Sequence, residues 1–349
     1  MKKMKKDKLR FLVIGDLHLN EWPEFATLIE VGNTYWNSRL VEQVQVLEQI
    51  YLYAKKYKPN VVVLLGDVFH RFTSLTSFVF KSFIDLLKTI KSVDVIYVIV
   101  GNHDYEDESR NIHYLSGFND YKVEIVDRPL YSFIAGGSVA YAFFVPYIRN
   151  IDNVEFYFKE LEEKNSNKDL RHKALIGFGH IDIENYRFGS GVYSKGLSLN
   201  YFSNFDLFIN GHYHNPNSSD YGNVLFAGAV MDFNFSDIGS NQKGIWFLDI
   251  DLNGNIRKKF LPLKYKKFIE VKSLEGIDTD KYYIRLLVDE IKKDMQNMKN
   301  IRFEFKGKKT KLAKLDYRKQ ILNYVNAYNG NKKKCKKYIL SVIKEKVLK

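Results

Sequence analysis

The chain has 349 residues, of which 45% are hydrophobic, 15% are aromatic and only six are proline. This composition excludes a largely disordered chain, and the length predicts either one large domain with an appendage or two domains. The single cysteine, Cys335, cannot form a disulfide within the chain, so nothing points to an oxidising compartment. The first apolar run, Leu9–Ile14, is interrupted by Gly15 and Asp16 and is too short for a signal sequence or a membrane span. We therefore expect a cytoplasmic protein with no membrane segment.

The formal net charge of +13 lies at one end of the chain. Residues 301–349 carry 16 Lys and Arg against three Asp and Glu, whereas the first 300 residues carry 38 side chains of each sign. A region of concentrated positive charge predicts contact with phosphates or with an acidic partner. The alternative, which the sequence leaves open, is a well-solvated surface without such a partner.

Apolar runs rich in Val, Ile and Phe predict buried strands at intervals through the first 250 residues. These runs are Leu9–Ile14, Val61–Leu65, Val95–Val100, Tyr141–Val145, Ala174–Phe178, Leu207–Ile209, Val224–Ala227 and Ile245–Ile250. Helical spacing predicts one helix from Leu40 to Tyr57, with Ser38 as its N-cap and Pro59 closing it, and a second over Ser77–Ile90. Strands that alternate with helices predict an α/β core with parallel pairing at its start.

The character of the sequence changes near residue 257, where lysines begin to alternate with apolar residues. We place a domain boundary there and expect a small α+β unit in residues 258–312. Its predicted elements are strands at Phe268–Val271 and Ile301–Phe305 around a helix at about Thr279–Met298. In residues 313–349, two apolar stripes at helical spacing, separated by Gly330, predict a basic helical hairpin.

Five of the predicted strands end at Gly or Asn-Gly and are followed by Asp, Asn or His. The motifs are GDLH after Ile14, GDVFH after Leu65, GNHD after Val100, GH after Phe178 and NGHYH after Ile209. Because the carboxyl ends of strands are where α/β proteins bind ligands, we expect these side chains to converge. The set is Asp16, His18, Asp67, Asn102, His103, His180, His212 and His214.

This set predicts a metal site. One buried histidine is more often a hydrogen-bonded core residue than a ligand, but six of the eight histidines fall in these motifs when His70 is included. Carboxylate, carboxamide and imidazole ligands together suit Mn²⁺, Fe²⁺ or Zn²⁺, whereas Mg²⁺ and Ca²⁺ prefer oxygen. Two metals about 3.5–4 Å apart can stabilise both the attacking and the leaving oxygen of a phosphoryl displacement. The pattern therefore favours two metals and a phosphoester substrate.

The ordered motifs Asp16-x-His18, Gly66-Asp67, Gly101–Asp104, Gly179-His180 and Gly211–His214 resemble those of the calcineurin-like metallophosphoesterases over residues 9–250. Within that superfamily, GDVFHR, GNHD, the long early helix and GAVMDFNFSD with the following KG resemble the SbcD-type nucleases of double-strand-break repair. The form of GHID and NGHYHNP is similar to the recombination endonuclease subunits of tailed phages. The resemblance implies an α/β/β/α sandwich of two sheets, a small α+β capping domain and a C-terminal helical hairpin.

The resemblance also implies roles for single residues. It assigns Asp16, His18, Asp67 and His214 to one metal and Asp67, Asn102, His180 and His212 to the other, with Mn²⁺ as the expected metal. His103 would contact the scissile phosphate and assist the leaving oxygen, with Asp104 orienting it. His70 would position the DNA backbone for exonucleolytic cutting, although a loop histidine that caps the next helix is the alternative. The continuation FTSLTS departs from the family pattern and puts the positioning of His70 in doubt. His113 and His172 lie outside the motifs, and we expect both at the surface.

By resemblance, the function is that of a DNA nuclease in repair and recombination, acting on duplex ends as an exonuclease and on single strands as an endonuclease. The capping domain would contact DNA, with Lys306, Lys308, Lys309 and Lys311 as candidates. The C-terminal helices would bind an SbcC-type ABC ATPase, or else fold back on their own core, and the protein would be a homodimer. The alternatives are a phosphatase or cyclic-nucleotide phosphodiesterase of small substrates, and a non-catalytic scaffold, which the complete ligand set disfavours. The many Lys and Asn residues agree with a phage origin.

Overall fold

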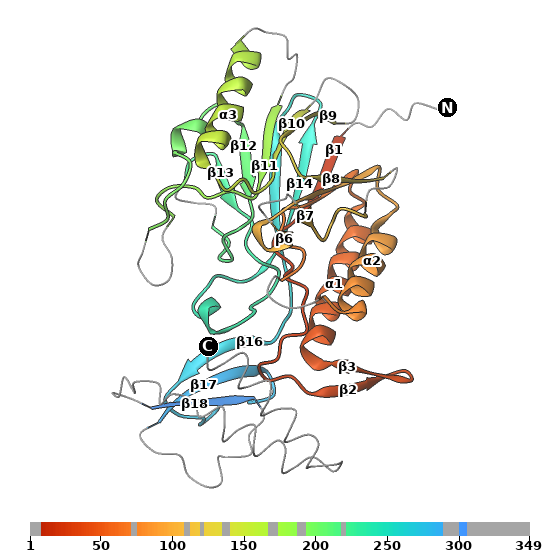
Figure 1. The fold of residues 1–349 in the computed structure, drawn as a ribbon, viewed down its shortest axis with the longest axis vertical. Coiled ribbons are helices and arrows are strands. Elements are labelled where there is room, and N and C mark those ends of the chain that lie inside the picture. Colours follow the sequence, from red (N-terminus) through yellow and green to blue (C-terminus); the bar gives the residue numbers. More distant parts are fainter. Residues whose placement is uncertain are drawn as a thin grey trace, which may run out of the picture.

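The computed structural model describes residues 8–70, 75–107, 112–118, 122–134, 140–166, 174–186, 193–217, 221–288 and 300–305. Two sheets pack face to face in the larger part of this structure, and a small sheet lies at one end (Figure 1). No helix in these ranges is long and apolar enough to cross a membrane. The predicted helical hairpin of residues 313–349 and the four candidate lysines lie outside the described residues.

The first sheet has six strands in the order β15-β14-β1-β4-β5-β8. Their bounds are Ile256–Pro262, Gly244–Asp251, Lys8–Ile14, Val61–Leu64, Val95–Ile99 and Val123–Val126. The strands from β1 to β8 run parallel, as the alternation of strands and helices predicted, whereas β14 and β15 join antiparallel. Residue 257, near which we place the predicted domain boundary, lies inside β15, which pairs with β14 along its length.

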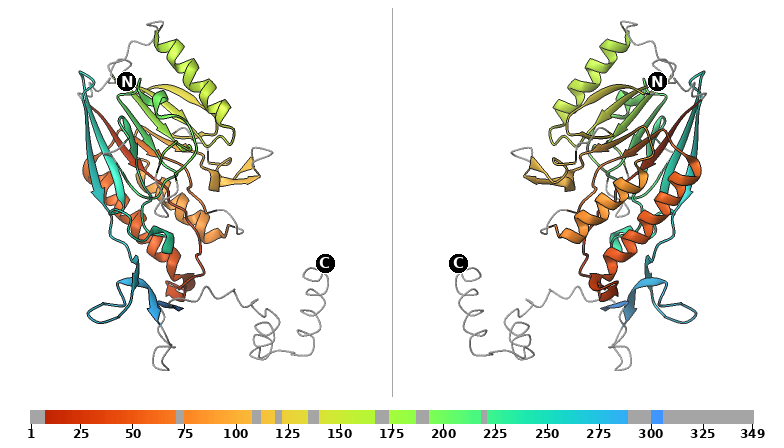
Figure 2. Two further views of the ribbon diagram at one scale, coloured as in Figure 1. Left: turned by 90° about the vertical axis from the view of Figure 1, so that its left-hand side faces the viewer. Right: turned by 90° about the vertical axis from the view of Figure 1, so that its right-hand side faces the viewer.

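Helices α1 (Ser38–Tyr57) and α2 (Ser77–Ile90) cover the outer face of this sheet (Figure 2). The predicted extent of α2 is confirmed. The N-cap of α1 is Asn37, and not Ser38 as predicted: its side-chain oxygen accepts hydrogen bonds from the backbone N–H groups of Arg39 and Leu40 at 2.9 and 3.1 Å. An Asn outside the first turn can satisfy two otherwise unpaired N–H groups, which stabilises the helix start.

The second sheet has five strands in the order β13-β12-β11-β10-β9. Their bounds are Val224–Phe226, Leu207–Asn210, Ala174–Gly179, Ala140–Val145 and Leu130–Ile134, and α3 (Ile151–Ser166) packs on the outer face. Successive residues of a strand point to opposite faces of the sheet, so alternate side chains of a strand enter two different cores. In β1, Phe11 and Val13 face the second sheet, and Leu12 and Ile14 face the helices. The predicted α/β/β/α sandwich is confirmed.

The small sheet consists of three parallel strands, β16 (Lys267–Val271), β17 (Tyr282–Val288) and β18 (Ile301–Phe305), in that order. The helix predicted from Thr279 is wrong over Tyr282–Val288, where the structure has β17. The segment is apolar and aromatic, and strand pairing on both sides buries Tyr283, Ile284 and Leu286. Residues 289–299 of the predicted helix lie outside the described ranges.

Contacts from α1 attach the small sheet to the sandwich. The buried guanidinium of Arg39 lies over the rings of Tyr283 and Phe268, 4.3 and 5.0 Å from their centroids. The hydroxyl of Tyr283 donates to Glu42 of the same helix at 2.5 Å. The described part of the chain also has two short ladders, β2 (Leu28–Val31) with β3 (Thr34–Asn37), and β6 (Tyr105–Asp107) with β7 (Ile112–His113), and three short 3-10 helices.

Candidate metal centre

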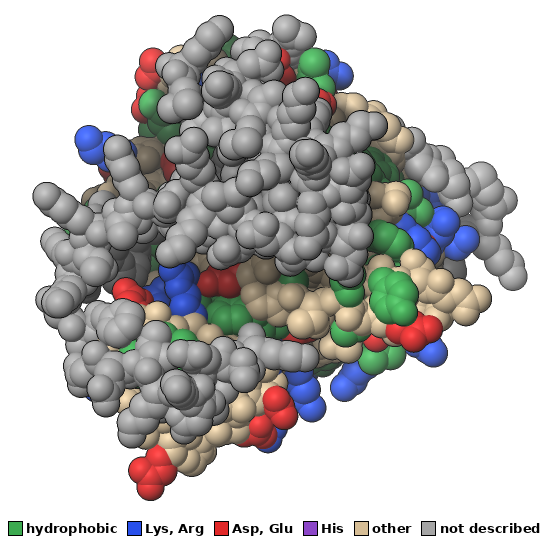
Figure 3. Space-filling view, turned by 60° about the horizontal axis from the view of Figure 1, so that its bottom comes forward, with side chains coloured by type: hydrophobic (Ala, Val, Ile, Leu, Met, Phe, Trp, Pro, Cys, Tyr) green, Lys and Arg blue, Asp and Glu red, His purple; other side chains and the backbone are tan. Residues whose placement is uncertain are grey.

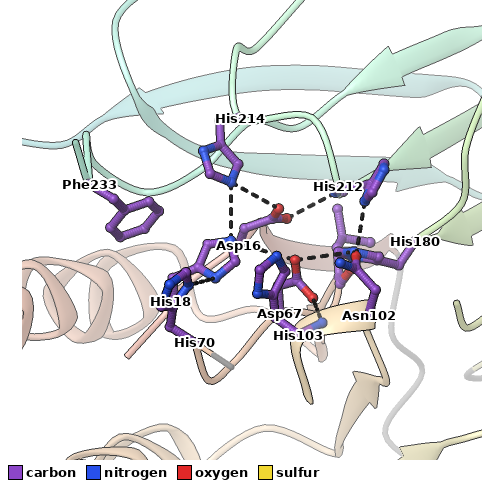
Figure 4. A network of polar contacts seen from close by, with 12 residues as sticks. Asp16, His18, Asp67, His70, Asn102, His103, His180, His212, His214 and Phe233 are labelled. Carbon is purple, nitrogen blue, oxygen red and sulfur yellow. Dashed lines mark hydrogen bonds and ion pairs between the residues drawn. The ribbon is translucent and has the colours of Figure 1, made fainter. Parts of the chain in front are cut away.

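The seven predicted metal ligands lie together at the carboxyl ends of strands from both sheets (Figure 4). Asp16 and His18 follow β1, Asp67 follows β4, Asn102 follows β5, His180 follows β11, and His212 and His214 follow β12. Strand register aligns these ends, since Ile14 pairs with Leu64 and Gly179 with Asn210. The backbone N–H of His212 donates to Asp16 at 3.1 Å, which joins the ends of the two sheets.

Four of these residues form a first group, which we call site A: Asp16, His18, Asp67 and His214. The Nε2 atoms of His18 and His214 lie 3.1 Å apart, and Nε2 of His18 lies 3.5 Å from Oδ2 of Asp67. Oδ2 of Asp16 lies 3.9 Å from Nε2 of His214. Three nitrogen and oxygen atoms of Asp16, His18 and His214 lie within 4.8 Å of one another, a spacing that can hold a metal ion.

The second group, site B, contains Asp67, Asn102, His180 and His212. Oδ1 of Asn102 lies 3.0 Å from Nε2 of His180 and 3.1 Å from Nδ1 of His212. Nε2 of His180 lies 3.4 Å from Oδ2 of Asp67. The same carboxylate oxygen of Asp67 therefore faces a histidine of site A and a histidine of site B.

The buried carboxylates fit a cation. Oδ2 of Asp16 is fully buried and has no hydrogen-bond partner among the described residues, whereas its Oδ1 accepts from the backbone of His212. An unpartnered buried carboxylate oxygen is costly unless a cation compensates it. Asp67 divides its oxygens similarly, because its Oδ1 accepts from the backbone N–H of His103 at 2.8 Å and its Oδ2 faces the histidines. The mixed oxygen and nitrogen set suits a divalent transition metal.

The backbone at the site is held in an uncommon conformation. Among the described residues, His18, Asp67 and His212 all have positive φ angles, of 42°, 48° and 69°. Such angles are unfavourable for residues with a Cβ and often mark functional sites. Gly66, with φ of 99°, leaves room for the ring of His180, since a Cβ there would lie 2.5 Å from Nδ1 of that ring. The glycines of the strand-end motifs thus allow ligands from the two sheets to approach one another.

Three of the histidines direct their second ring nitrogen to an oxygen. Nδ1 of His180 lies 2.7 Å from the carbonyl oxygen of Leu65, Nε2 of His212 lies 2.9 Å from Asp182, and Nδ1 of His214 lies 3.1 Å from Asp237. Such acceptors fix the tautomer and the orientation of a metal-binding imidazole. We had not predicted a role for Asp182 or Asp237, although both lie within the quoted motifs GHID and GAVMDFNFSD.

A buried lysine supports the histidine of site A from behind. Nζ of Lys243 donates to the carbonyl oxygen of His214 at 2.7 Å and lies 3.5 and 4.0 Å from carboxylate oxygens of Asp237 and Asp232. Asp232 in turn accepts from the backbone N–H of Phe268 in β16 at 3.4 Å. This network explains the KG dipeptide after the quoted motif, and it connects the small sheet to a predicted metal ligand.

His103 and His70 lie beside site A. Their rings are stacked, with centroids 5.0 Å apart, and the ring of His103 lies edge-on to that of His18 at 4.8 Å. Nδ1 of His70 lies 3.2 Å from Nδ1 of His18. Both rings are half-buried, whereas His18 is buried. The two residues therefore border the metal groups on the side of site A.

Asp104, to which the resemblance gives the role of orienting His103, lies between two backbone segments. Its two oxygens accept hydrogen bonds from the backbone N–H groups of Phe69 and Gly101, each at 2.9 Å. Asp104 therefore holds the chain after β4 against the chain after β5. Its burial, with the nearby negative charge of Asp67, raises the pKa of this carboxyl to about 8.

The imidazoles at the site differ in charge. Burial lowers the pKa of His18 well below its usual value and lowers that of His70 to about 4, so both rings are neutral near pH 7. Burial would also lower the pKa of His180, but the carboxylate of Asp67 raises it to about 10. A metal ion held at site B would take the place of this proton, because only the neutral imidazole can be a ligand.

The remaining histidines lie elsewhere. The expectation of a surface position is wrong for His113, which is buried in β7, with Nε2 3.8 Å from Asp127. Its role is in packing, since its ring lies edge-on to that of Tyr105, on the strand with which β7 pairs. His172 lies outside the described residues.

Fold and site together define a metallophosphoesterase, a hydrolase of phosphoester bonds. A sequence model of the family described as calcineurin-like phosphoesterase matches residues 9–216, and the chain belongs to this family.

Two named relatives are nucleases. The SbcD component of the nuclease SbcCD from Staphylococcus epidermidis is 26% identical over 269 residues, which cover 68% of this chain and 67% of the relative. Exonuclease subunit 1 of Enterobacteria phage T4 is 20% identical over 273 residues, 72% of each chain. Among solved structures, a purple acid phosphatase from yellow lupin (Lupinus luteus) seeds covers 74% of this chain and 52% of its own, at 12% identity and a TM-score of 0.47.

Proposed function

We propose that the chain is a DNA nuclease that uses two divalent metal ions, with Mn²⁺ as the proposed metal. It would act on duplex ends as an exonuclease and on single strands as an endonuclease. The observation that carries the proposal is the shared carboxylate: Oδ2 of Asp67 lies 3.5 Å from Nε2 of His18 and 3.4 Å from Nε2 of His180. One carboxylate between two ligand groups suits a pair of ions that acts on a phosphodiester. The names of the two relatives, a nuclease and an exonuclease, support a nucleic acid as the substrate.

Side chains of the chain itself would bind and orient the substrate. Metal ions held at sites A and B would lower the pKa of the attacking water and offset the charge that develops on the phosphate oxygens. His103, bordering site A, is placed to contact the scissile phosphate and to give a proton to the leaving oxygen. His70, stacked on His103, would hold the adjoining phosphate in position.

The proposal includes partners. The name of the staphylococcal relative, a subunit of SbcCD, supports a second subunit as the partner. We propose that this partner is an SbcC-type ATPase and that residues 313–349 bind it. Residues 258–312 are the proposed DNA-contact domain, with Lys306, Lys308, Lys309 and Lys311 as candidates, and the assembly would be a homodimer. On the face in Figure 3, the described surface mixes basic, acidic and hydrophobic side chains. The basic excess of residues 301–349 supports DNA contact by the C-terminal region.

The test compares two substrates. The full chain would be incubated, with saturating Mn²⁺, with end-labelled duplex DNA and separately with a small chromogenic phosphodiester. We expect the wild type to cleave both, Asp67→Ala to cleave neither, and His70→Ala to retain ester cleavage while it loses duplex degradation.

Cleavage of the small ester with no action on DNA, even with a candidate ATPase subunit present, would contradict the nuclease proposal. It would instead support a phosphatase or cyclic-nucleotide phosphodiesterase on the same fold.

A further inference from the structure

His18 is the exception among the four histidines of sites A and B. The other three direct their second ring nitrogen to a carboxylate or a carbonyl oxygen. The second nitrogen of His18, Nδ1, lies 3.2 Å from Nδ1 of His70. A neutral imidazole has one N–H and one bare nitrogen, so one of these two atoms donates and the other accepts.

The metal-facing side of His18 decides which atom donates. Its Nε2 lies 3.1 Å from Nε2 of His214 and 3.5 Å from Oδ2 of Asp67, inside site A. A metal ligand nitrogen must be bare, so the proton of a metal-bound His18 is on Nδ1. This N–H then donates to Nδ1 of His70, and neutral His70 carries its own proton on Nε2.

Ring packing holds His70 in the accepting position. The indole of Trp22 packs on the imidazole with centroids 4.2 Å apart, and His103 stacks on it at 5.0 Å with an interplanar angle of 15°. Trp22 is itself stacked on the ring of Phe233. The centroid of the Phe233 ring lies 5.1 Å from that of His18 and 5.5 Å from that of His214. These contacts oppose rotation of the His70 ring away from His18.

We propose that His70 is a positioning residue for site A: its Nδ1 accepts the proton of the metal ligand His18, and this contact fixes the tautomer of both rings. The inference rests on the ligand set of the proposed function and adds a second role to the phosphate contact proposed for His70. Metal affinity and phosphate positioning are thereby joined in one side chain. Loss of an outer partner of this kind typically lowers metal affinity by about 10–100-fold.

The test is calorimetric titration of Mn²⁺ into the metal-free full chain, with no DNA present. We expect His70→Ala to weaken binding at site A by about 10–100-fold and to leave site B unchanged. Asp182→Ala removes the hydrogen-bond partner of His212, so the binding step that it weakens in the titration is the one that belongs to site B.

Two further variants of His70 separate this role from a general structural one. His70→Asn places an oxygen near the position of Nδ1 and should restore binding at site A. His70→Gln places its oxygen near the position of Nε2 and should not. The comparison is valid at equal fold content, measured by circular dichroism. In the Zn²⁺-loaded protein, nitrogen NMR should show a bare Nδ1 and a protonated Nε2 in His70.

Unchanged Mn²⁺ affinity in His70→Ala, or equal affinities in the Asn and Gln variants, would overturn the inference. A failure of the nuclease proposal is recognised separately, because it would appear in DNA digestion while the metal titration still distinguished the variants.

Discussion

Replacing Gly66 by alanine should destabilise the two-sheet domain by roughly 2–5 kcal/mol. A non-glycine residue with φ in the left-handed region costs about 1–2 kcal/mol, and Gly66 has φ of 99°. The new Cβ would also lie 2.5 and 2.8 Å from two atoms of the His180 ring and 3.0 Å from Cα of Gly101. Overpacking of a filled interior costs about 1–3 kcal/mol more. The His180 ring cannot move freely, because its Nδ1 is hydrogen-bonded to the carbonyl oxygen of Leu65.

Gly32→Ala is the matched control. Gly32 also has a positive φ, of 63°, but nothing lies within 4 Å of its added Cβ, so only the conformational cost of about 1–2 kcal/mol applies. Urea unfolding of the metal-free proteins, followed by tryptophan fluorescence, measures both changes, since Trp22, Trp36 and Trp246 all lie in the two-sheet domain. A Gly66→Ala variant that loses no more stability than Gly32→Ala would refute the steric argument.

Three further outcomes are expected. Asp237→Ala should lower Mn²⁺ affinity at site A and cost about 3–5 kcal/mol in unfolding free energy, because it leaves buried Lys243 without its nearer carboxylate; an unchanged urea midpoint would contradict this. Burial raises the pKa of Asp232 from 3.8 to about 6, so folding takes up a proton at this carboxyl. Protonated Asp232 therefore adds on the order of 3 kcal/mol to the free energy of unfolding below about pH 4, and this contribution is lost as the pH rises to 6. Asp232→Asn should therefore show a smaller loss of stability over pH 4–6 in urea unfolding, and an identical slope would count against it. Removing metal with a chelator should lower the melting temperature, since free Mn²⁺ at 100 times its Kd stabilises the folded state by about 2.7 kcal/mol. Equal melting curves with and without the chelator would speak against a metal site in the folded protein.

The ligands could be predicted because their signals are local. Each lies within a few residues of the end of an apolar strand, and strand ends of one sheet necessarily lie side by side. What the sequence could not show is the partner of each ligand. Asp182, in the loop after β11, is hydrogen-bonded to His212, in the loop after β12. Asp237 is hydrogen-bonded to His214, which precedes it in the sequence. Such pairs depend on the path of the loops between strands, which strand patterns do not determine.

The wrong predictions have a common cause, the override of local preference by tertiary contacts. Residues 282–288 form a strand because two neighbouring strands pair with them. His113 is buried because β7 pairs with β6, although the residues that precede β7 in the sequence, 106–111, are all polar. Asn37 caps α1 in place of Ser38, whose hydroxyl instead accepts from the backbone of Thr27. Sequence spacing alone cannot rank such competing contacts.

The strand order of the first sheet has a consequence for biosynthesis. β1 is made long before β14, which is one of its neighbours in the sheet, with Lys8 paired to Asp251. Until the ribosome has made β14, that edge of β1, with the apolar residues Phe11 to Ile14, has no native partner. Contacts of such large sequence separation form late, and an unpaired apolar edge can pair with another chain. Nascent chains that stop before β14 should therefore depend on chaperones, whatever the stability of the finished protein.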